Sequence, residues 1–271
     1  MTINSYLTNI ANAAITRDQE KLAIQKSINT LQLRLKSHFG TQMTDSYVFG
    51  SYGRGTILPR NMDANSDVDY IVVFSEGGLR PQSYLDRLRR FAELNYQRSD
   101  IEQSNPTMVL DLNHIRFELV PAIQSWFGGL QIPARASDAN DWQGTDPKGF
   151  NEILSAANQT HKNMIKPLVR LVKYWNVVNG SPFESYSLEQ KVAGHNFGLF
   201  GFFNSCPLED YFFDYIAGME TSIFAPNWQR DAVARAKKIA SEAKLMERSG
   251  NAGSAELHIK KLLPPVNGLF A

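Results

Sequence analysis

The sequence predicts an α+β protein in which a mixed sheet packed with helices is followed by an all-helical second half. Apolar runs of strand length, such as Val68–Phe74 and Ile115–Val120, lie in the first half of the chain. From Phe150 onward, apolar residues recur at the three- and four-residue spacing of helices. This change of character predicts two lobes, residues 1–130 and 131–271, with a ligand cleft between them.

The first predicted element is a helix over Thr16–His38. Threonine is a good capping residue, so Thr16 is expected to cap the first turn. Four apolar residues recur along this helix at three- and four-residue spacing: Ile24, Ile28, Leu31 and Leu35. Such a stripe is typical of a helix face that packs into a core. We expect this N-terminal helix to pack across both lobes.

The sheet is predicted from short apolar segments separated by turn-forming residues. A Gly-Ser turn follows Phe49, and residues 52–66 are expected to form a long loop because they contain Pro59 and several Asn and Asp residues. Asn113-His114 is expected to form the turn of a hairpin. The expected strands are Ser46–Phe49, Val68–Phe74, Met108–Leu112 and Ile115–Val120.

The remaining elements are predicted to be helices. Ser83–Tyr96 is amphipathic. Its inward-facing residues are expected to include Leu85, Leu88 and Leu94. Gln131–Gly149 is rich in Pro, Asp, Ala and Gly, and is expected to be an irregular connection. The helices expected after it cover about residues 150–158, 161–178, 187–203, 208–218, 229–248 and 253–263.

Bulk composition narrows the class of protein. The 271 residues carry a formal net charge of +1, which is unlike a general nucleic-acid binder. The single cysteine, Cys206, excludes an internal disulfide and a cysteine-based zinc site, and this fits a reducing cytosol. No apolar run is long enough to span a membrane, and Met1–Thr16 lacks the features of a secretory signal. We therefore expect a cytoplasmic protein with no membrane partner.

The most informative segment joins a small-residue turn to two carboxylates at the start of a strand. Gly50 and Ser51 form the turn, and Asp67 and Asp69 precede a buried apolar run. Side chains alternate along a strand, so both carboxylates leave the same face. Two adjacent carboxylates repel unless a cation lies between them, and such oxygen ligands suit Mg²⁺ or Mn²⁺. The Gly-Ser turn can offer backbone N–H groups and a hydroxyl to a phosphate.

A third carboxylate is expected near this pair. A phosphoryl-transfer site needs a group that deprotonates the attacking hydroxyl and completes the metal shell. Two candidates lie on the predicted hairpin: Asp111 interrupts one apolar strand, and Glu118 stands between Phe117 and Leu119 on the other. Residue chemistry alone leaves the choice between Asp111 and Glu118 open.

Several segments together resemble the nucleotidyltransferase superfamily that includes DNA polymerase beta, and most closely its bacterial cGAS/DncV-like members. The segments that carry the resemblance are Gly50–Thr56, Asp67–Asp69, Phe117–Ala122, Leu171–Asn176 and Ser185–Glu189. The resemblance extends over nearly the whole chain, and Ala255–Pro265 is similar to the family's final helix. It implies a polymerase-beta-like catalytic lobe over residues 1–130 and a helical lobe over 131–271.

The resemblance also implies roles for individual residues of the first lobe. Gly50 and Ser51 match the turn that holds the incoming triphosphate, and Asp67 and Asp69 match the two metal-binding acids. Glu118 matches the third acid, at a place where relatives such as oligoadenylate synthetase carry Asp in a Phe-Asp-Val-Leu-Pro-Ala segment. Together, these acids imply two Mg²⁺ or Mn²⁺ ions per active site.

In the second lobe, three residues match contacts to one nucleotide. Lys173 and Ser185 match triphosphate contacts, and Tyr186 matches an aromatic residue that stacks on the base. On residue chemistry alone, other roles fit these side chains too. Lys173 could be a solvated helix lysine, and Tyr186 could be a core residue. Ser185 could cap a helix that begins near Ser187.

The implied activity is template-independent nucleotidyl transfer. It would join nucleoside triphosphates, ATP among them, into a cyclic di- or trinucleotide second messenger for anti-phage signalling, with release of pyrophosphate. The near-zero net charge and the scattered histidines speak against stable nucleic-acid binding, and a regulatory protein partner is left unidentified. Three other functions stay open: transfer to an RNA 3′ end or a small-molecule acceptor, nucleotide binding without catalysis, and an antitoxin-like interaction protein on the same fold, although such proteins usually lack the helical lobe.

Overall fold

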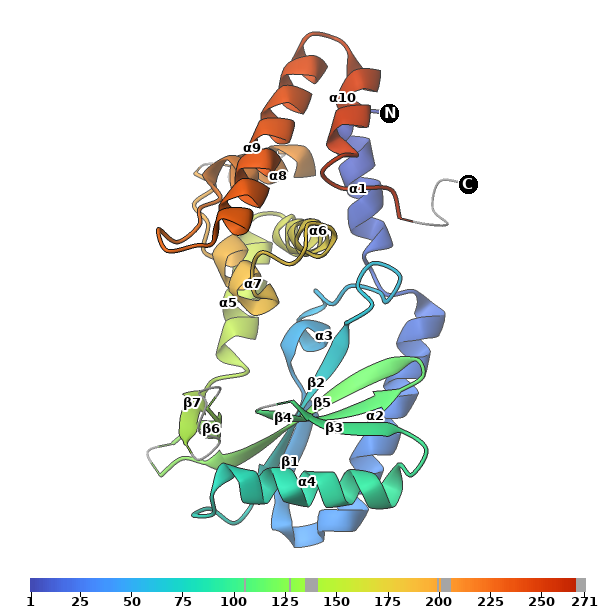
Figure 1. Ribbon diagram of the computed structural model, residues 1–271, viewed down its shortest axis with the longest axis vertical. Coiled ribbons are helices and arrows are strands. Elements are labelled where there is room, and N and C mark those ends of the chain that lie inside the picture. Colours follow the sequence, from blue (N-terminus) through green and yellow to red (C-terminus); the bar gives the residue numbers. More distant parts are fainter. Residues whose placement is uncertain (105, 127, 135–140, 199, 201–205, 267–271) are drawn as a thin grey trace. The chain divides into compact units, whose positions relative to one another are not determined.

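The computed structural model describes the chain except residues 105, 127, 135–140, 199, 201–205 and 267–271 (Figure 1). The described chain divides into two compact units. The sheet unit comprises residues 17–55 and 65–151, and the helical unit comprises residues 1–16, 56–64 and 152–271. Both units are assembled from separate stretches of sequence, whereas the lobes predicted from the sequence are continuous.

In the sheet unit, seven described strands form one mixed sheet. Its main path runs β1-β2-β5-β4-β3, while β6 pairs with β5 and β7 pairs with β6. β2 and β5 are parallel, and the other pairs are antiparallel. The strands are β1 (Met43–Val48), β2 (Asp67–Phe74), β3 (Asp100–Ser104), β4 (Thr107–Leu112), β5 (Ile115–Gln124), β6 (Leu130–Pro133) and β7 (Trp142–Thr145). The mixed sheet, the four expected strands and the β4–β5 hairpin are confirmed.

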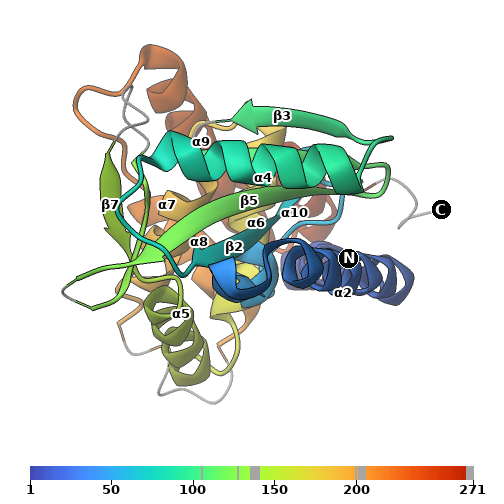
Figure 2. The same ribbon diagram turned by 90° about the horizontal axis from the view of Figure 1, so that it is seen from below.

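Two helices of the sheet unit, α2 (Asp18–Phe39) and α4 (Pro81–Asn95), pack against the sheet. On β2, the ring of Phe74 lies 5.2 Å from that of Phe39 in α2 and 5.1 Å from that of Tyr84 in α4. Figure 2 shows α4 running alongside β5 and β3. The stripe expected on α2 is confirmed by the burial of all its residues: Ile24, Ile28, Leu31 and Leu35.

The start of α2 differs from the expectation. The helix begins at Asp18 after Arg17, whose side chain makes no capping hydrogen bond, so Thr16 is not the cap. Asp18 and Glu20 lie in the first turn, where negative charge is favoured by the helix dipole. The start of α2 is therefore favoured by acidic residues in its first turn rather than by a threonine cap.

Two further details of this unit correct the sequence-based expectation. Leu94 does not face inward: its side chain is 65% exposed, because it falls outside the stripe that continues from Leu88 to Phe91. The Gly-Ser turn is the first turn of a short helix, α3 (Gly50–Arg54), rather than an open turn. Arg54 is buried at the end of α3, with its guanidinium 5.2 Å from the centre of the Phe150 ring.

Three strands were not expected. β3 has the sequence Asp-Ile-Glu-Gln-Ser and alternates exposed with half-buried residues, so it lacks an apolar run. β6 and β7 are four residues long each and pair within the segment that was expected to be irregular. Residues 135–140 of that segment lie outside the described residues.

The helical second half is confirmed. Its helices are α5 (Gly149–Thr160), α6 (Ile165–Val178), α7 (Ser185–Ala193), α8 (Leu208–Gly218), α9 (Asn227–Arg248) and α10 (Ala252–Ile259). Ten residues of α6 are buried, and this helix contacts α7, α8 and the N-terminal helix α1 (Ile3–Ala13). Arg170 of α6 donates from Nε to the carbonyl of Ala11 at 3.2 Å, and burial lowers its pKa to about 10. None of the described helices is both long and apolar enough to cross a bilayer.

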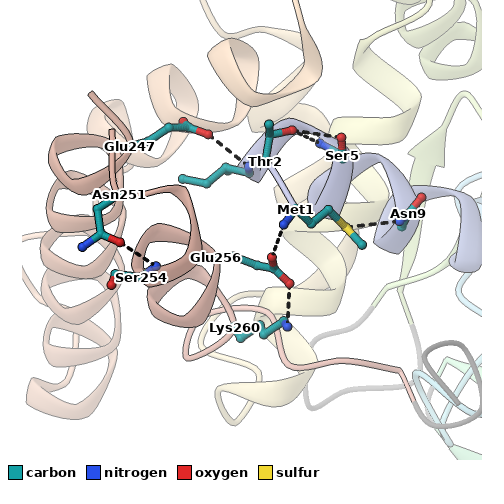
Figure 3. A network of polar contacts seen from close by, with 10 residues as sticks. Met1, Thr2, Ser5, Asn9, Glu247, Asn251, Ser254, Glu256 and Lys260 are labelled. Atoms are coloured by element: carbon teal, nitrogen blue, oxygen red, sulfur yellow. Dashed lines mark hydrogen bonds and ion pairs between the residues drawn. The ribbon is translucent and has the colours of Figure 1, made fainter. Parts of the chain in front are cut away.

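The helix α1 was missed by the sequence analysis, and it is tied to the last two helices (Figure 3). The Met1 ammonium lies 2.8 Å from Oε2 of Glu256 in α10, and the Ile3 amide donates to Oε1 of Glu247 in α9 at 3.1 Å. Lys260 pairs with Glu256 at 2.7 Å. Hydrogen bonds from Lys260 and the N-terminal ammonium hold the pKa of Glu256 below its usual value. Segments at opposite ends of the chain thus form one cluster.

Two of the expected helices are shorter than their apolar patterns suggested. The helix expected over residues 187–203 ends at Ala193, and residues 199 and 201–203 lie outside the described residues. The last helix ends at Ile259 rather than at residue 263. Residues 260–262 form turns, and Pro264-Pro265 prevents the helix from continuing.

Candidate active site

The acidic pair lies at the start of β2, on one face of the strand. Asp67 and Asp69 are half-buried, whereas Val68 and Tyr70 between and after them are buried on the other face. This alternation is the period of a strand with one packed face. The two carboxylates therefore leave the sheet together, as the sequence predicted.

The neighbouring parallel strand β5 places a third carboxylate on the same face. Glu118 lies opposite Asp69 in the β2–β5 register, and Arg116 lies opposite Asp67. Adjacent strands are about 4.8 Å apart, so Glu118 starts one strand spacing from Asp69. The two strands therefore present four charged side chains on one face: Asp67, Asp69, Arg116 and Glu118.

Asp111 occupies a different place. It lies on β4, opposite Arg116, and Arg116 in turn lies opposite Asp67. Two strand spacings, about 10 Å, therefore separate Asp111 from Asp67, and the position of Arg116 on β5 lies between them. The register favours Glu118 over Asp111 as the partner of the acidic pair.

Gly50 is held against Asp69 by the path of the chain from β1. The Phe49 amide donates to the carbonyl of Asp69 at 3.0 Å, and Gly50 then adopts a φ of +65°. A Cβ atom at this position would lie 1.7 Å from Oδ2 of Asp69. Only glycine fits both the left-handed backbone and the close approach. Ser51 follows in the first turn of α3.

A threonine that the sequence analysis did not single out contacts the third acid. Oγ1 of Thr107 lies 3.4 Å from Oε2 of Glu118 and 2.9 Å from the carbonyl of Ser104. Thr107 is on β4, two residues from the position opposite Glu118, so its side chain shares the acidic face. A threonine hydroxyl has one hydrogen to donate, and the closer acceptor is the Ser104 carbonyl, so Thr107 is a polar neighbour of the Glu118 carboxylate on this face. No local motif marks this residue, because its role depends on the strand register.

The acidic face continues into an apolar patch toward the other end of β2. Ile71, Val73 and Ala122 are buried there, and they are packed by Tyr47, Phe49, Leu130 and Ile132. A hollow of about 490 Å³ opens near this end of the strand and is lined in part by Tyr47, Val73 and Lys148. The carboxylates thus lie next to a packed apolar patch on the same strands, and they do not line that hollow.

The donor chemistry of the acidic face fits Mg²⁺ or Mn²⁺, since these ions prefer carboxylate oxygens. Asp67, Asp69 and Glu118 supply three such groups from two adjacent strands, beside a glycine that carries no side chain. Across the described residues, no three His, Cys, Asp or Glu side chains are already gathered closely enough to hold an ion. The strands therefore supply the donors and their common face, and an ion would draw the carboxylates together.

In the helical unit, Lys173 is not a solvated lysine. It is 6% exposed, and its Nζ lies 3.2 Å from Oε1 of Glu189, which is itself 1% exposed. The pair joins α6 to α7. Glu189 lies in the Ser-Tyr-Ser-Leu-Glu segment that the sequence analysis noted, but its link to Lys173 was not foreseen. A solvated role for Lys173 is therefore wrong.

Ser185 and Tyr186 lie in the first turn of α7. The helix begins at Ser185 after Glu184, so Ser185 is not the cap of a helix that starts at Ser187. Tyr186 is 41% exposed, so it is not a core residue. The helical unit thus groups Lys173 with the turn that carries Ser185 and Tyr186, and the sheet unit groups Gly50 and Ser51 with the three acids.

Comparison with known proteins places this arrangement in a family. Residues 1–158 match the family model of the Second Messenger Oligonucleotide or Dinucleotide Synthetase domain, abbreviated SMODS. The chain belongs to the SMODS family. The match covers the whole acidic face and its glycine turn, and it stops before Lys173 and α7.

Curated relatives of this SMODS chain align with part of it. A cyclic AMP-AMP-AMP synthase from Acinetobacter sp. is 28% identical over 178 residues, which is 62% of this chain and 51% of that protein. A probable cyclic nucleotide synthase from Bacillus cereus is 24% identical over 172 residues, or 60% of this chain and 50% of that protein. The chain thus spans about half the length of the curated relatives that it matches.

Solved structures share the fold of both units. The CD-NTase CdnG of Bradyrhizobium diazoefficiens, in complex with GTP, superposes with a TM-score of 0.70 at 10% identity, covering 95% of this chain and 98% of that chain. At these identities the likeness shows the fold alone. It confirms the expected α+β architecture, a mixed sheet with helices followed by a helical second half.

Proposed function

We propose that this SMODS chain is a template-independent nucleotidyltransferase that joins nucleoside triphosphates into a cyclic di- or trinucleotide. The observation that carries the proposal is the acidic face, where Asp69 has Gly50 against it and Glu118 opposite it. Membership of the family and the synthase names of the two curated relatives support the same function. We further propose that the product serves anti-phage signalling in the cytoplasm.

The proposed reaction is an in-line phosphoryl transfer between two nucleotides. A ribose hydroxyl of one nucleotide attacks the α-phosphorus of another, and the bond from that phosphorus to the bridging oxygen breaks to release pyrophosphate. The hydroxyl proton passes to a carboxylate oxygen of Glu118, beside which Oγ1 of Thr107 lies. Asp67, Asp69 and Glu118 would hold two Mg²⁺ or Mn²⁺ ions, whose positive charge stabilises the charge that develops on the transferred phosphoryl group.

Each unit would supply nucleotide contacts of its own. Ser51, beside Gly50, would donate a hydroxyl hydrogen bond to a phosphate. Lys173 and Ser185 would contact the triphosphate, and the exposed ring of Tyr186 would stack on a base. Stacking tolerates any base, so base choice must come from contacts to base edges.

Two alternative functions predict different outcomes when NTPs are added. A transferase for an RNA 3′ end or a small acceptor would form a bond only when that acceptor is added. A non-catalytic nucleotide-binding protein would bind NTPs and release them unchanged. The acidic face speaks against the second alternative, since its three carboxylates are the kind of ligands that Mg²⁺ and Mn²⁺ prefer.

One experiment separates these functions. Pure protein is incubated with labelled NTPs and Mg²⁺ or Mn²⁺ without acceptor, and the products are resolved after phosphatase treatment. A phosphatase-resistant product that requires the metal supports the proposal. Unchanged NTPs, or products that depend on an added acceptor, would assign one of the alternatives. The Asp67→Asn variant is the control for contaminating activity.

A further inference from the structure

Two side chains of helix α6 contact the chain immediately before and immediately after the first turn of α7. Lys173 and Asn176 are three residues apart on α6, so their side chains lie on one face of that helix. Asn176 contacts the segment just before α7, and Lys173 contacts the helix just beyond its first turn. Ser185 and Tyr186 lie between these two contacts.

The contact before the turn is made to the backbone of Phe183. Nδ2 of Asn176 donates to the Phe183 carbonyl at 2.8 Å, and the Phe183 amide donates back to Oδ1 of Asn176 at 2.9 Å. Asn176 is only 4% exposed. From α9, Nε2 of Gln229 donates to the carbonyl of Pro182 at 2.6 Å. The two residues that precede Glu184 are therefore fixed by side chains from other helices.

The contact beyond the turn is the buried ion pair. Glu189 is 1% exposed and accepts from Nζ of Lys173 at 3.2 Å. Burying two charges is costly unless they are paired, and removal of one leaves the other uncompensated. A structural need for stability is met more cheaply by apolar residues of the same size. Stability alone therefore does not account for a charged pair at this place.

We infer that Glu189 and Asn176 are positioning residues for nucleotide binding, through Lys173 and through the Ser185–Tyr186 turn respectively. Glu189 supplies the counter-charge that keeps the Lys173 ammonium beside the turn, and Asn176 fixes the backbone from which Tyr186 projects. This inference rests on the proposed function, because that function assigns the triphosphate to Lys173 and Ser185. Groups that are already ordered lower the entropic cost of binding.

A double-mutant cycle tests the role of Glu189. The variants are Glu189→Gln, Lys173→Met and the double variant, with nucleotide Kd, KM, kcat and Tm measured for each, using ATP and GTP as probes. Glu189→Gln is expected to raise Kd and KM about tenfold, the scale of one charge-assisted hydrogen bond, with kcat nearly unchanged. Because Glu189 acts through Lys173, the double variant should bind as weakly as Lys173→Met alone. Glu189→Asp, which keeps the charge, should recover part of the affinity.

The double variant also controls for loss of binding that is caused by unfolding. Glu189→Gln alone leaves Lys173 buried without its partner, whereas the double variant leaves no buried charge unpaired. The matched control is Glu256→Gln, which removes a carboxylate that pairs with Lys260 in the same unit. That control is expected to change Tm but to keep the nucleotide Kd within twofold.

A parallel cycle tests Asn176. Asn176→Ala should raise the nucleotide Kd in the wild-type background and have little further effect once Tyr186→Ala has removed the ring. Wild-type nucleotide affinity in the folded Glu189→Gln and Asn176→Ala variants would overturn this inference but not the proposed function. The same holds if the affinity losses of the single variants add up in the double variants. A wild-type protein that binds no NTP would overturn the proposed function as well.

Discussion

At the scale of single residues, the candidate active site is centred on Asp69. The backbone of Phe49 donates to its carbonyl, Gly50 lies against its carboxylate, and Glu118 lies opposite it on β5. The spacing of Asp67 and Asp69 predicted their common face from the sequence. The choice between Glu118 and Asp111 needed the strand order, because residues far apart in sequence become neighbours only through pairing of β2 with β5.

Replacing either acid of the pair by its amide is expected to abolish product formation. Asp67→Asn or Asp69→Asn removes a charge that would hold the metal ions but keeps the side-chain shape. Because the lost charge relieves repulsion within the acidic row, Tm should stay the same or rise. Product yield and Tm are measured for both variants. Turnover above a few per cent of the wild type would contradict the two-metal interpretation.

The third acid is assigned by comparing two conservative variants. Glu118→Gln should lose product formation, because Glu118 lies one strand spacing from Asp69. Asp111→Asn should keep most of the activity, since Arg116 lies between Asp111 and the pair. Both variants are assayed side by side with the same NTPs and metal. Full activity of Glu118→Gln together with loss in Asp111→Asn would reverse the assignment.

The exposed ring of Tyr186 is expected to carry base stacking. Loss of a stacked aromatic side chain costs about 1–3 kcal/mol per base. Tyr186→Ala should therefore weaken nucleotide binding about tenfold or more, whereas Tyr186→Phe keeps the ring and should bind nearly as well as the wild type. Kd for ATP and GTP is measured for both. Equal losses would show that the hydroxyl matters and that stacking does not.

At the scale of elements, the turn from β1 into α3 determines how closely the backbone approaches β2. Its left-handed glycine was visible in the sequence as a Gly-Ser pair, but its approach to Asp69 was not. Elements with a strong apolar period, such as α2 and β5, were predicted well. α1, β3, β6 and β7 were missed, because they are short or partly polar and owe their order to neighbouring segments.

A glycine comparison tests the importance of this close approach. Gly50→Ala places a Cβ 1.7 Å from Oδ2 of Asp69, so it should destabilise the protein and abolish activity. Gly55 has a similar φ of +71° and nothing within 4 Å, so Gly55→Ala should cost only the backbone strain, about 1–2 kcal/mol. Urea unfolding and product yield are measured for both. Equal effects would show that backbone strain alone explains the loss at Gly50.

At the scale of the whole molecule, the sequence predicted a mixed first half and a helical second half but not how the chain is shared between them. Residues 1–16 and 56–64 belong to the helical unit, although they precede or interrupt the segments of the sheet unit. The reason is packing between segments that are far apart in the sequence. Tyr6 donates from its hydroxyl to the carbonyl of Leu263 at 2.7 Å, and such a long-range contact leaves no periodic signal in the sequence.

The chain is expected to make a small, phosphatase-resistant nucleotide ring without template or primer. Its net charge of +1 makes a long polyanion a poor acceptor at physiological salt. The proposed contacts, Ser51, Lys173, Ser185 and Tyr186, suffice for nucleotides and require no groove for a macromolecule. Mass spectrometry should find the mass of two or three nucleoside monophosphates less the same number of waters, and chelation of the metal should remove this product. Ring closure requires the hydroxyl end and the phosphate end of one linear intermediate to meet at the same three carboxylates. If only linear chains form under every combination of metal and base, ring closure is excluded and nucleotidyl transfer remains as the activity.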